Sequence, residues 1–232
     1  MYRDYKKKFQ NSVIPDVKRV NLYYDILSPY SWLCFEILTR YKSKWRNMDL
    51  RLKPLSQEDV LKGAGNQLPG NVPIKMQYIL QDLARLGKYH QDLKDVMYVK
   101  GSRPAMLFIT AVDMENPEYT EELSRQLWLR VWGKDEGITT DDDISQAASK
   151  AGISKEMVVK CLNKAKEPDV SARFKVYTDE ALSLGAFGTP TIVIHNSGKK
   201  EMIFGSDRLD IVANFIGETY EGPLNDLSKI KQ

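Results

Sequence analysis

The residues with the clearest chemical potential are two serines in one short segment, Asp25-Ile-Leu-Ser-Pro-Tyr-Ser-Trp32. Ser28 stands at the expected N-cap of a helix, and Pro29 suits the first helical position because its φ is already fixed. The first turn of a helix leaves backbone N–H groups unpaired and carries roughly half a positive charge. A hydroxyl placed there can hold an anion, although an ordinary N-cap has the same sequence.

The sequence on both sides of this segment predicts the elements that position it. Residues 20–26 alternate between apolar and polar side chains, which is typical of a strand. Apolar residues then recur at helical spacing, which predicts a helix from about Tyr30 to Trp45. Residues 48–54 alternate again and stop at a proline. The chain therefore begins as strand, helix, strand, with Ser28 at the first strand-to-helix corner.

A thioredoxin-type redox site would place two cysteines three residues apart at such a corner. In this chain those positions are Ser28 and Ser31, which cannot form a disulfide. The corner is instead suited to holding the thiolate of another molecule. The chain's own cysteines, Cys34 and Cys161, are far apart and lack metal-ligand spacing, so we expect both to be buried small hydrophobes.

Residues 57–179 contain helical patterns separated by breakers and no convincing strand. An irregular loop from Gly63 to Pro73 precedes a helix that is marked by Ile79, Leu80, Leu83 and Leu86 and that we expect to end near Gly87. Trp128 and Trp132 fall on one helical segment and are expected in the core or at an interface. Residues 140–143 include three aspartates but precede a helix, where acidic groups complement the helix dipole. We therefore predict no metal site.

The sheet resumes near the C-terminus. Residues 191–194 and 201–204 flank Asn196-Ser-Gly198, a pattern typical of a hairpin, and residues 205–208 open a last amphipathic helix. The order is that of an α/β thioredoxin fold with a large all-helical domain inserted between its β-α-β start and its β-β-α end. We assign residues 19–56 and 180–225 to the thioredoxin-like domain, 57–179 to the inserted helical domain, 1–18 to an N-terminal arm and 226–232 to a C-terminal tail.

Composition limits the classes of function. With 232 residues and 42% hydrophobic content, the chain can bury a sizeable core. Its 34 basic and 31 acidic residues leave a net charge of only +3, which argues against a nucleic-acid partner. The sequence shows neither an apolar run of the ~18 residues that a membrane span requires nor a secretory signal. We therefore expect an intracellular protein.

Three segments together resemble the kappa-class glutathione transferases: Asp25-Ile-Leu-Ser-Pro-Tyr-Ser-Trp32, Gly185-Ala-Phe-Gly-Thr-Pro190 and Phe204-Gly-Ser-Asp-Arg208. The likeness spans roughly residues 20–225 and includes Gly65-Asn66, Lys75 and the segment 125–132. Each piece alone is weak, but all of them in this order are specific. The class is related to glutathione-dependent 2-hydroxychromene-2-carboxylate isomerases and, more distantly, to periplasmic disulfide oxidoreductases with two active cysteines.

The resemblance implies that the thioredoxin-like domain binds glutathione as a cosubstrate, without another cofactor. It makes Ser28 the catalytic residue, whose hydroxyl and helix dipole would lower a thiol pKa from ~8.5 toward neutrality. It also implies a homodimer, small electrophilic or peroxide substrates, and a location in mitochondria or peroxisomes. The C-terminus, Ser228-Lys-Ile-Lys-Gln232, lacks an ending of the Ser-Lys-Leu type, which weakens the peroxisomal option.

The resemblance further implies which residues contact each of the three parts of glutathione. Thr189, before an expected cis proline, would pair through its backbone with the tripeptide's cysteine. Lys75 and Asn66 would meet the glycine end, while Ser206 and Asp207 would meet the γ-glutamyl carboxylate and ammonium. Each also has a structural interpretation, as a turn, cap or solvated residue. The glutathione-binding residues implied are Ser28, Pro29, Tyr30, Asn66, Lys75, Thr189, Pro190, Ser206 and Asp207.

Our main hypothesis is a glutathione S-transferase that ionises glutathione for conjugation to electrophiles, with a possible peroxidase activity. One alternative keeps the site but catalyses isomerisation of the 2-hydroxychromene-2-carboxylate type. Another is a non-enzymatic interaction protein or chaperone, which predicts loss of Ser28, Asp207 or the Thr189-Pro190 pair; all are present. His90 and His195 match no catalytic position, and we expect them on the surface or in a strand.

Overall fold

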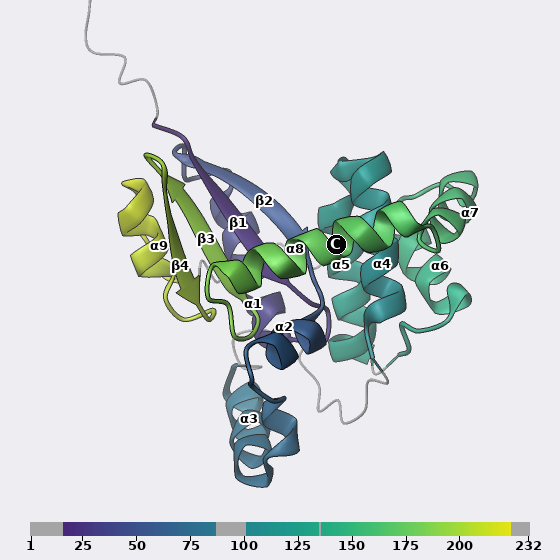
Figure 1. Cartoon of the computed structure of the whole chain (residues 1–232), viewed down its shortest axis with the longest axis horizontal. Helices are drawn as coiled ribbons and strands as arrows, with labels where there is room; N and C mark the ends of the chain where they lie inside the picture. Colours follow the sequence, from purple (N-terminus) through teal and green to yellow (C-terminus); the bar gives the residue numbers. More distant parts are fainter. Residues whose placement is uncertain (1–15, 87–100, 135, 224–232) are drawn as a thin grey trace, which may run out of the picture.

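The computed structural model describes residues 16–86, 101–134 and 136–223 (Figure 1). Its sheet has the strand order β2-β1-β3-β4. Strand β1 (Lys18–Tyr24) is parallel to β2 (Met48–Pro54) and antiparallel to β3 (Thr191–Asn196), which forms the expected hairpin with β4 (Lys199–Phe204). Residues 1–15 of the predicted arm, the tail 226–232 and His90 lie outside the described residues.

The alternation of side chains along the strands gives the sheet two apolar faces. On one face, Val20 and Leu22 pack with helix α1 (Pro29–Tyr41) and helix α9 (Leu209–Ile216). On the other face, Tyr23 and Val193 pack against helix α8 (Pro168–Ser183), which Figure 1 shows running from the helical block across the sheet. The sheet is therefore the central layer that fixes where α1 begins.

Between β2 and β3, the described residues form helices and turns, as predicted. Helix α6 starts with a capping box between Thr140 and Asp143, so the three aspartates lie in the first turn of a helix, as expected.

Over the described residues, no cluster of side chains has the make-up of a metal site, and no helix is long and apolar enough to cross a membrane. The elements of this block are α2 (Gln57–Gly63), a 3₁₀ turn (Pro69–Asn71), α3 (Pro73–Leu86), α4 (Arg103–Glu115), a 3₁₀ turn (Pro117–Tyr119), α5 (Thr120–Trp128), a π-helical turn (Leu129–Gly133), α6 (Asp141–Lys150), α7 (Lys155–Lys164) and the start of α8.

One predicted helix boundary was wrong. Helix α1 ends at Tyr41 rather than Trp45, because an exposed turn at residues 42–44 returns the chain to β2. Trp45 is still buried, since its ring stacks on Tyr41 at 4.1 Å. Helix α3 begins at Pro73, where the predicted loop ends, and it includes Ile79, Leu80 and Leu83 as predicted.

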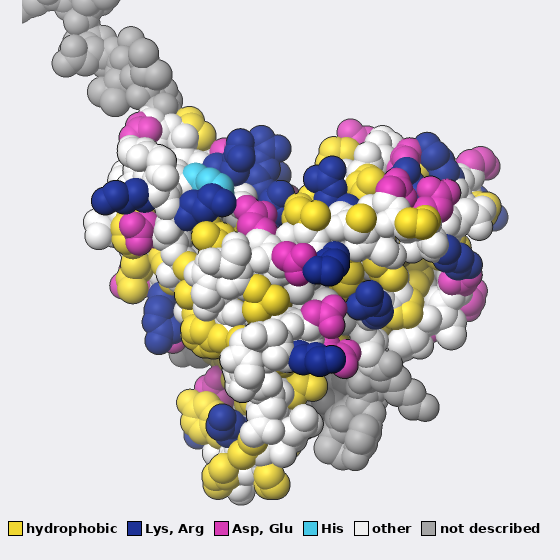
Figure 2. Space-filling model, viewed as in Figure 1, with side chains coloured by type: hydrophobic (Ala, Val, Ile, Leu, Met, Phe, Trp, Pro, Cys, Tyr) yellow, Lys and Arg dark blue, Asp and Glu magenta, His cyan; other side chains and the backbone are white. Residues whose placement is uncertain are grey.

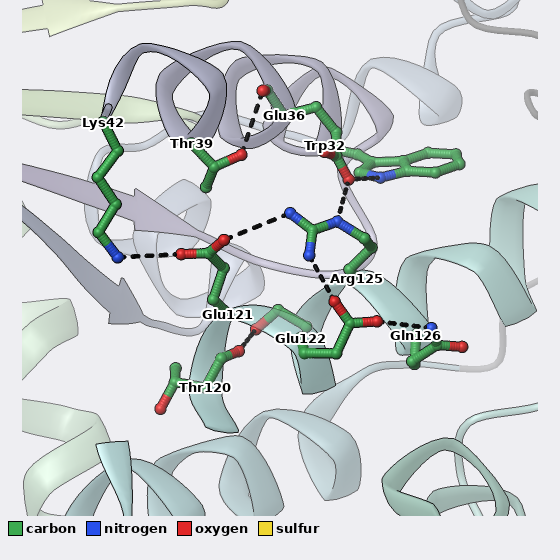
Figure 3. A network of polar contacts seen from close by, with 10 residues as sticks. Trp32, Glu36, Thr39, Lys42, Thr120, Glu121, Glu122, Arg125 and Gln126 are labelled. Carbon is green, nitrogen blue, oxygen red and sulfur yellow. Dashed lines mark hydrogen bonds and ion pairs between the residues drawn. The ribbon is translucent and has the colours of Figure 1, made fainter. Parts of the chain in front are cut away.

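A network of charged side chains fastens α1 to α5 (Figure 3). Arg125 Nε donates to Glu36 Oε1 at 2.9 Å, and the same guanidinium pairs with Glu121 and Glu122 on its own helix. Glu36 also accepts the Trp32 indole N–H. The side chains of Arg125 and Glu36 are 23% and 12% exposed. This pair therefore lies largely out of water, at the junction between the sheet layer and the helical block.

We predict that Arg125→Met lowers the free energy of unfolding by about 2 kcal/mol, because it leaves the Glu36 carboxylate unpaired in a partly buried site. Lys42→Met is the matched control, since Lys42 pairs with Glu121 while 58% exposed. Its effect should stay below about 0.5 kcal/mol. Chemical denaturation of the two variants measures both values, and equal effects would contradict the role assigned to Arg125.

Candidate functional site

Ser28 is the N-cap of α1, as the sequence predicts. Its Oγ accepts a hydrogen bond from the Ser31 backbone N–H at 3.0 Å, and Pro29 occupies the first turn. The Ser28 N–H donates to the Asp25 carbonyl oxygen at 3.0 Å, which closes the turn between β1 and α1. Ser28 is 4% exposed. The local sequence therefore places a nearly buried hydroxyl at the positive end of a helix.

The loop before β3 lies directly against this hydroxyl. Ser28 Oγ donates to the Thr189 carbonyl oxygen at 3.3 Å, and the Thr189–Pro190 peptide bond is cis, as expected. The Pro190 carbonyl oxygen accepts from Gly205 N at 3.0 Å, which brings residues 205–207 alongside. Three segments far apart in the sequence thus meet at one place.

Two polar residues beneath this junction were not identified from the sequence. Asp25 Oδ1 accepts from Leu27 N and Oδ2 from Gln57 N, both at 3.0 Å. Burial raises the pKa of the Asp25 carboxyl, and hydrogen bonds from Ser102, Gln57 and Leu27 oppose that rise. The Gln57 side-chain oxygen in turn accepts the Thr189 hydroxyl. The sequence signal that could have identified Asp25 is an acidic residue directly after an apolar strand. No feature of the sequence singles out Gln57.

Two adjoining cavities, of about 480 and 1030 Å³, open beside Ser28. Tyr30, Lys75 and Thr189 line both of them. Every predicted glutathione-binding residue lines one or the other, so the fold brings together positions that the sequence separates. The smaller cavity adds Ser28, Pro29 and Asn66, and the larger adds Pro190, Ser206 and Asp207.

The predicted residues at the cavity ends have defined neighbours. Asn66 Nδ2 donates to the Phe187 carbonyl oxygen at 2.8 Å. Ser206 and Asp207 lie in a bend before Arg208, the N-cap of α9, rather than in the first helical turn. Asp207 pairs with the Arg208 guanidinium at 2.8 Å. The carboxylate that is expected to meet an ammonium group therefore already has a cation beside it.

Helix α3 forms the outer wall of both cavities. The Tyr30 hydroxyl donates to Asp82 Oδ2 at 2.8 Å and so ties α1 to α3. The pKa of Tyr30 is raised, mainly by burial and to a smaller extent by the hydrogen bond to Asp82. Opposite α3, Trp132 lines the smaller cavity and donates its indole N–H to the Ile26 carbonyl oxygen at 3.1 Å. The larger cavity has a mainly apolar wall, formed by Leu33, Ile37, Ile74, Tyr78, Ile79, Leu86 and Tyr220.

The chain's own thiols are poorly suited to chemistry here. Cys34 and Cys161 are both free and buried, as predicted, and burial raises the pKa of each thiol. His195 lies in β3, as expected, with its Nε2 at 3.1 Å from Asn21 Nδ2, and it lines neither cavity. Neither cysteine lines the two cavities beside Ser28.

The Gln57–Thr189 hydrogen bond yields a prediction about the site's rigidity. Thr189→Val and Gln57→Met each leave one partner unpaired and should each lower the free energy of unfolding by about 1 kcal/mol. The double variant should cost less than the sum of the two, because it removes both partners. Denaturant titrations of the four proteins measure this coupling. Strictly additive losses would show that the two side chains do not act together.

Comparisons with known proteins agree with this geometry. The family model of the DsbA-like thioredoxin domain matches residues 19–217. A solved structure of 2-hydroxychromene-2-carboxylate isomerase has a TM-score of 0.68 at 20% identity, covering 86% of this chain and 94% of that chain. These two results confirm the predicted α/β thioredoxin fold, and the helices between β2 and β3 are consistent with the predicted insertion.

Curated relatives are more similar in sequence. Glutathione S-transferase kappa 1 of Homo sapiens is 44% identical over 217 residues, which cover 90% of this chain and 96% of the human protein. The protein of the same name from Rattus norvegicus is 42% identical with the same coverage. With its DsbA-like thioredoxin domain, this chain belongs to the kappa-class glutathione transferases, as its sequence motifs predict.

Proposed function

We propose that this enzyme binds glutathione in the two adjoining cavities, ionises its thiol at Ser28 and transfers the thiolate to small apolar electrophiles. One observation carries the proposal: the Ser28 hydroxyl lies at a helix N-terminus, against Thr189, and lines the smaller of two adjoining cavities that together are lined by every predicted glutathione residue. The relatives at 44% and 42% identity support the same reaction.

The hydrogen bonds around Ser28 suggest how binding and ionisation are coupled. In the present structure the hydroxyl donates to the Thr189 carbonyl oxygen. The backbone N–H of glutathione's cysteine would take over that carbonyl, as an added strand does, and free the hydroxyl to donate to sulfur. Meanwhile the Ser31 N–H remains bonded to Ser28 Oγ and makes the hydroxyl a stronger donor. The dipole of α1 then favours the thiolate over the thiol.

Charged residues at the two ends of the cavities would hold the ends of glutathione. Lys75 on α3 is exposed and can pair with the glycine carboxylate. At the other end, Ser206 and Arg208 line the larger cavity with Asp207. The Asp207–Arg208 pair matches the ammonium and carboxylate of the γ-glutamyl group with one opposite charge each.

The apolar wall of the larger cavity would receive the second substrate. Its side chains come from α1, α3 and residues near Tyr220, and they favour a small apolar electrophile. The same thiolate would also attack the terminal oxygen of a hydroperoxide, releasing the alcohol. The sulfenic acid formed on glutathione would then react with a second glutathione to give the disulfide and water.

Two other functions use the same geometry. An isomerase of the 2-hydroxychromene-2-carboxylate type would add glutathione to a double bond and expel it; the solved isomerase shares the fold at 20% identity, which is weaker support than the kappa relatives give. Turnover of such a substrate well above that of chloronitrobenzene-type acceptors would favour it. A binding protein without chemistry would show no turnover at all. A homodimer and a mitochondrial or peroxisomal location belong to our proposal through the family resemblance.

We predict that Ser28→Ala lowers kcat/KM for conjugation by about a hundredfold, because it removes the donor to the developing thiolate. Ser31→Ala is the matched control. Its hydroxyl is equally buried in the same corner and has no hydrogen-bond partner among the described residues. That variant should retain the wild-type rate in steady-state assays. A Ser28→Ala enzyme with wild-type turnover would refute activation by this hydroxyl.

The role of Lys75 can be tested by changing the ligand together with the protein. Wild-type enzyme should bind glutathione esterified at its glycine carboxylate about tenfold more weakly than glutathione, because a charge-assisted hydrogen bond is lost. Lys75→Met should bind both compounds with the same reduced affinity. Lys62→Met, an exposed lysine outside the cavities, should behave like wild type. Calorimetry that finds Lys75→Met still able to distinguish the ester would contradict this assignment.

A further inference from the structure

A third cavity, of about 460 Å³, lies along the edge strand β2, where the sheet meets the helical block. It shares no lining residue with the two cavities beside Ser28. Figure 2 shows a hollow between the upper end of the sheet and the helical block, with Lys and Arg side chains on its sheet side. Its volume falls in the range of small-molecule sites.

Two half-buried charges of opposite sign line this cavity without contacting each other. The Lys53 ammonium lies 4.2 Å from the centre of the Tyr177 ring, and no carboxylate of the described residues is within ion-pair distance of it. Asp113 accepts a hydrogen bond from the Thr120 hydroxyl at 3.1 Å and lies against the Tyr177 hydroxyl. Burial lowers the pKa of Lys53 and raises that of Asp113, while the hydrogen bond from Thr120 and the nearby charges of Lys53 and Arg173 oppose the rise at Asp113. Charges withdrawn from water are costly until each meets an opposite charge.

The other charged residues of the cavity are already paired or lie at its rim. Lys42 and Glu121 form an ion pair at 3.2 Å, which Figure 3 shows beside Thr120. Arg51 pairs with Asp49 at 3.0 Å. The lining contains three basic residues, Lys42, Arg51 and Lys53, and three acidic ones, Asp113, Glu118 and Glu121.

This balance of charge limits the kind of ligand. A ligand with a net charge would meet as many like charges as opposite ones. A neutral molecule that carries both an ammonium and a carboxylate can instead pair with Asp113 and Lys53 together. Leu50, Leu52, Pro117 and the Tyr177 ring also line the cavity and offer apolar contact to the rest of the ligand.

We propose that this cavity binds a free α-amino acid with an apolar side chain, its carboxylate on Lys53 and its ammonium on Asp113. The site is separate from the glutathione site and does not depend on the transferase reaction.

The first test is calorimetry on the full chain with L-leucine and L-phenylalanine as probes. Two analogues of leucine, 4-methylpentanoate and isopentylamine, keep the side chain but carry only one of the two charges. We expect at least one amino acid to bind, and each leucine analogue to bind at least about tenfold more weakly than L-leucine. If neither amino acid binds, or if one analogue binds as well as L-leucine, the proposal is overturned.

The second test assigns the two charges. Lys53→Met and Asp113→Asn should each weaken binding of the same probes about tenfold, while Lys155→Met, an exposed lysine at the start of α7, should not. Asp113→Asn keeps a hydrogen-bond acceptor for the Thr120 hydroxyl, so we expect this variant to fold. It therefore still tests the site if Lys53→Met does not fold. Glutathione conjugation should be unchanged in all three variants. Amino-acid binding that survives both Lys53→Met and Asp113→Asn would place the ligand elsewhere.

Discussion

The candidate site depends on one contact, between the Ser28 hydroxyl and the Thr189 carbonyl oxygen at 3.3 Å. It joins the start of α1 to the loop before β3, and both are held by the pairing of β1 with β3 in the sheet. Beneath it, Asp25 and Gln57 connect the same corner to the start of α2 through buried hydrogen bonds. These bonds form within the chain itself, so the polar groups of the site hold fixed positions without a ligand.

The helix N-terminus at Ser28 can stabilise a thiolate although the chain has no cysteine at that position. A helix N-terminus that carries cysteines supports disulfide exchange, because the chain supplies the thiolate itself. Here serines hold those positions, and Cys34 is buried with a raised thiol pKa. In our proposal, the same helix N-terminus acts on the thiol of bound glutathione. The DsbA-like thioredoxin domain of this chain therefore carries serines, Ser28 and Ser31, at the two positions where a thioredoxin-type redox site has cysteines.

The sequence predicted those parts of the molecule that local chemistry determines. The Ser28 cap, the strands and the hairpin follow from Ser-Pro, period-two alternation and Asn-Ser-Gly, each readable within a few residues. Gln57 was missed because its role arises only where α2 meets the loop before Pro190. The cavity at β2 depends on elements from four parts of the chain, which no sequence motif connects.

The central claim is that Ser28 and the dipole of α1 ionise bound glutathione. The most direct measurement is the titration of the glutathione thiol on the enzyme, followed by NMR of glutathione labelled with ¹³C at the cysteine β-carbon. Our account predicts a bound thiol pKa well below the value of about 8.5 for a free thiol, with the ¹³C shift of a thiolate near neutral pH. A bound thiol that titrates like free glutathione would contradict it.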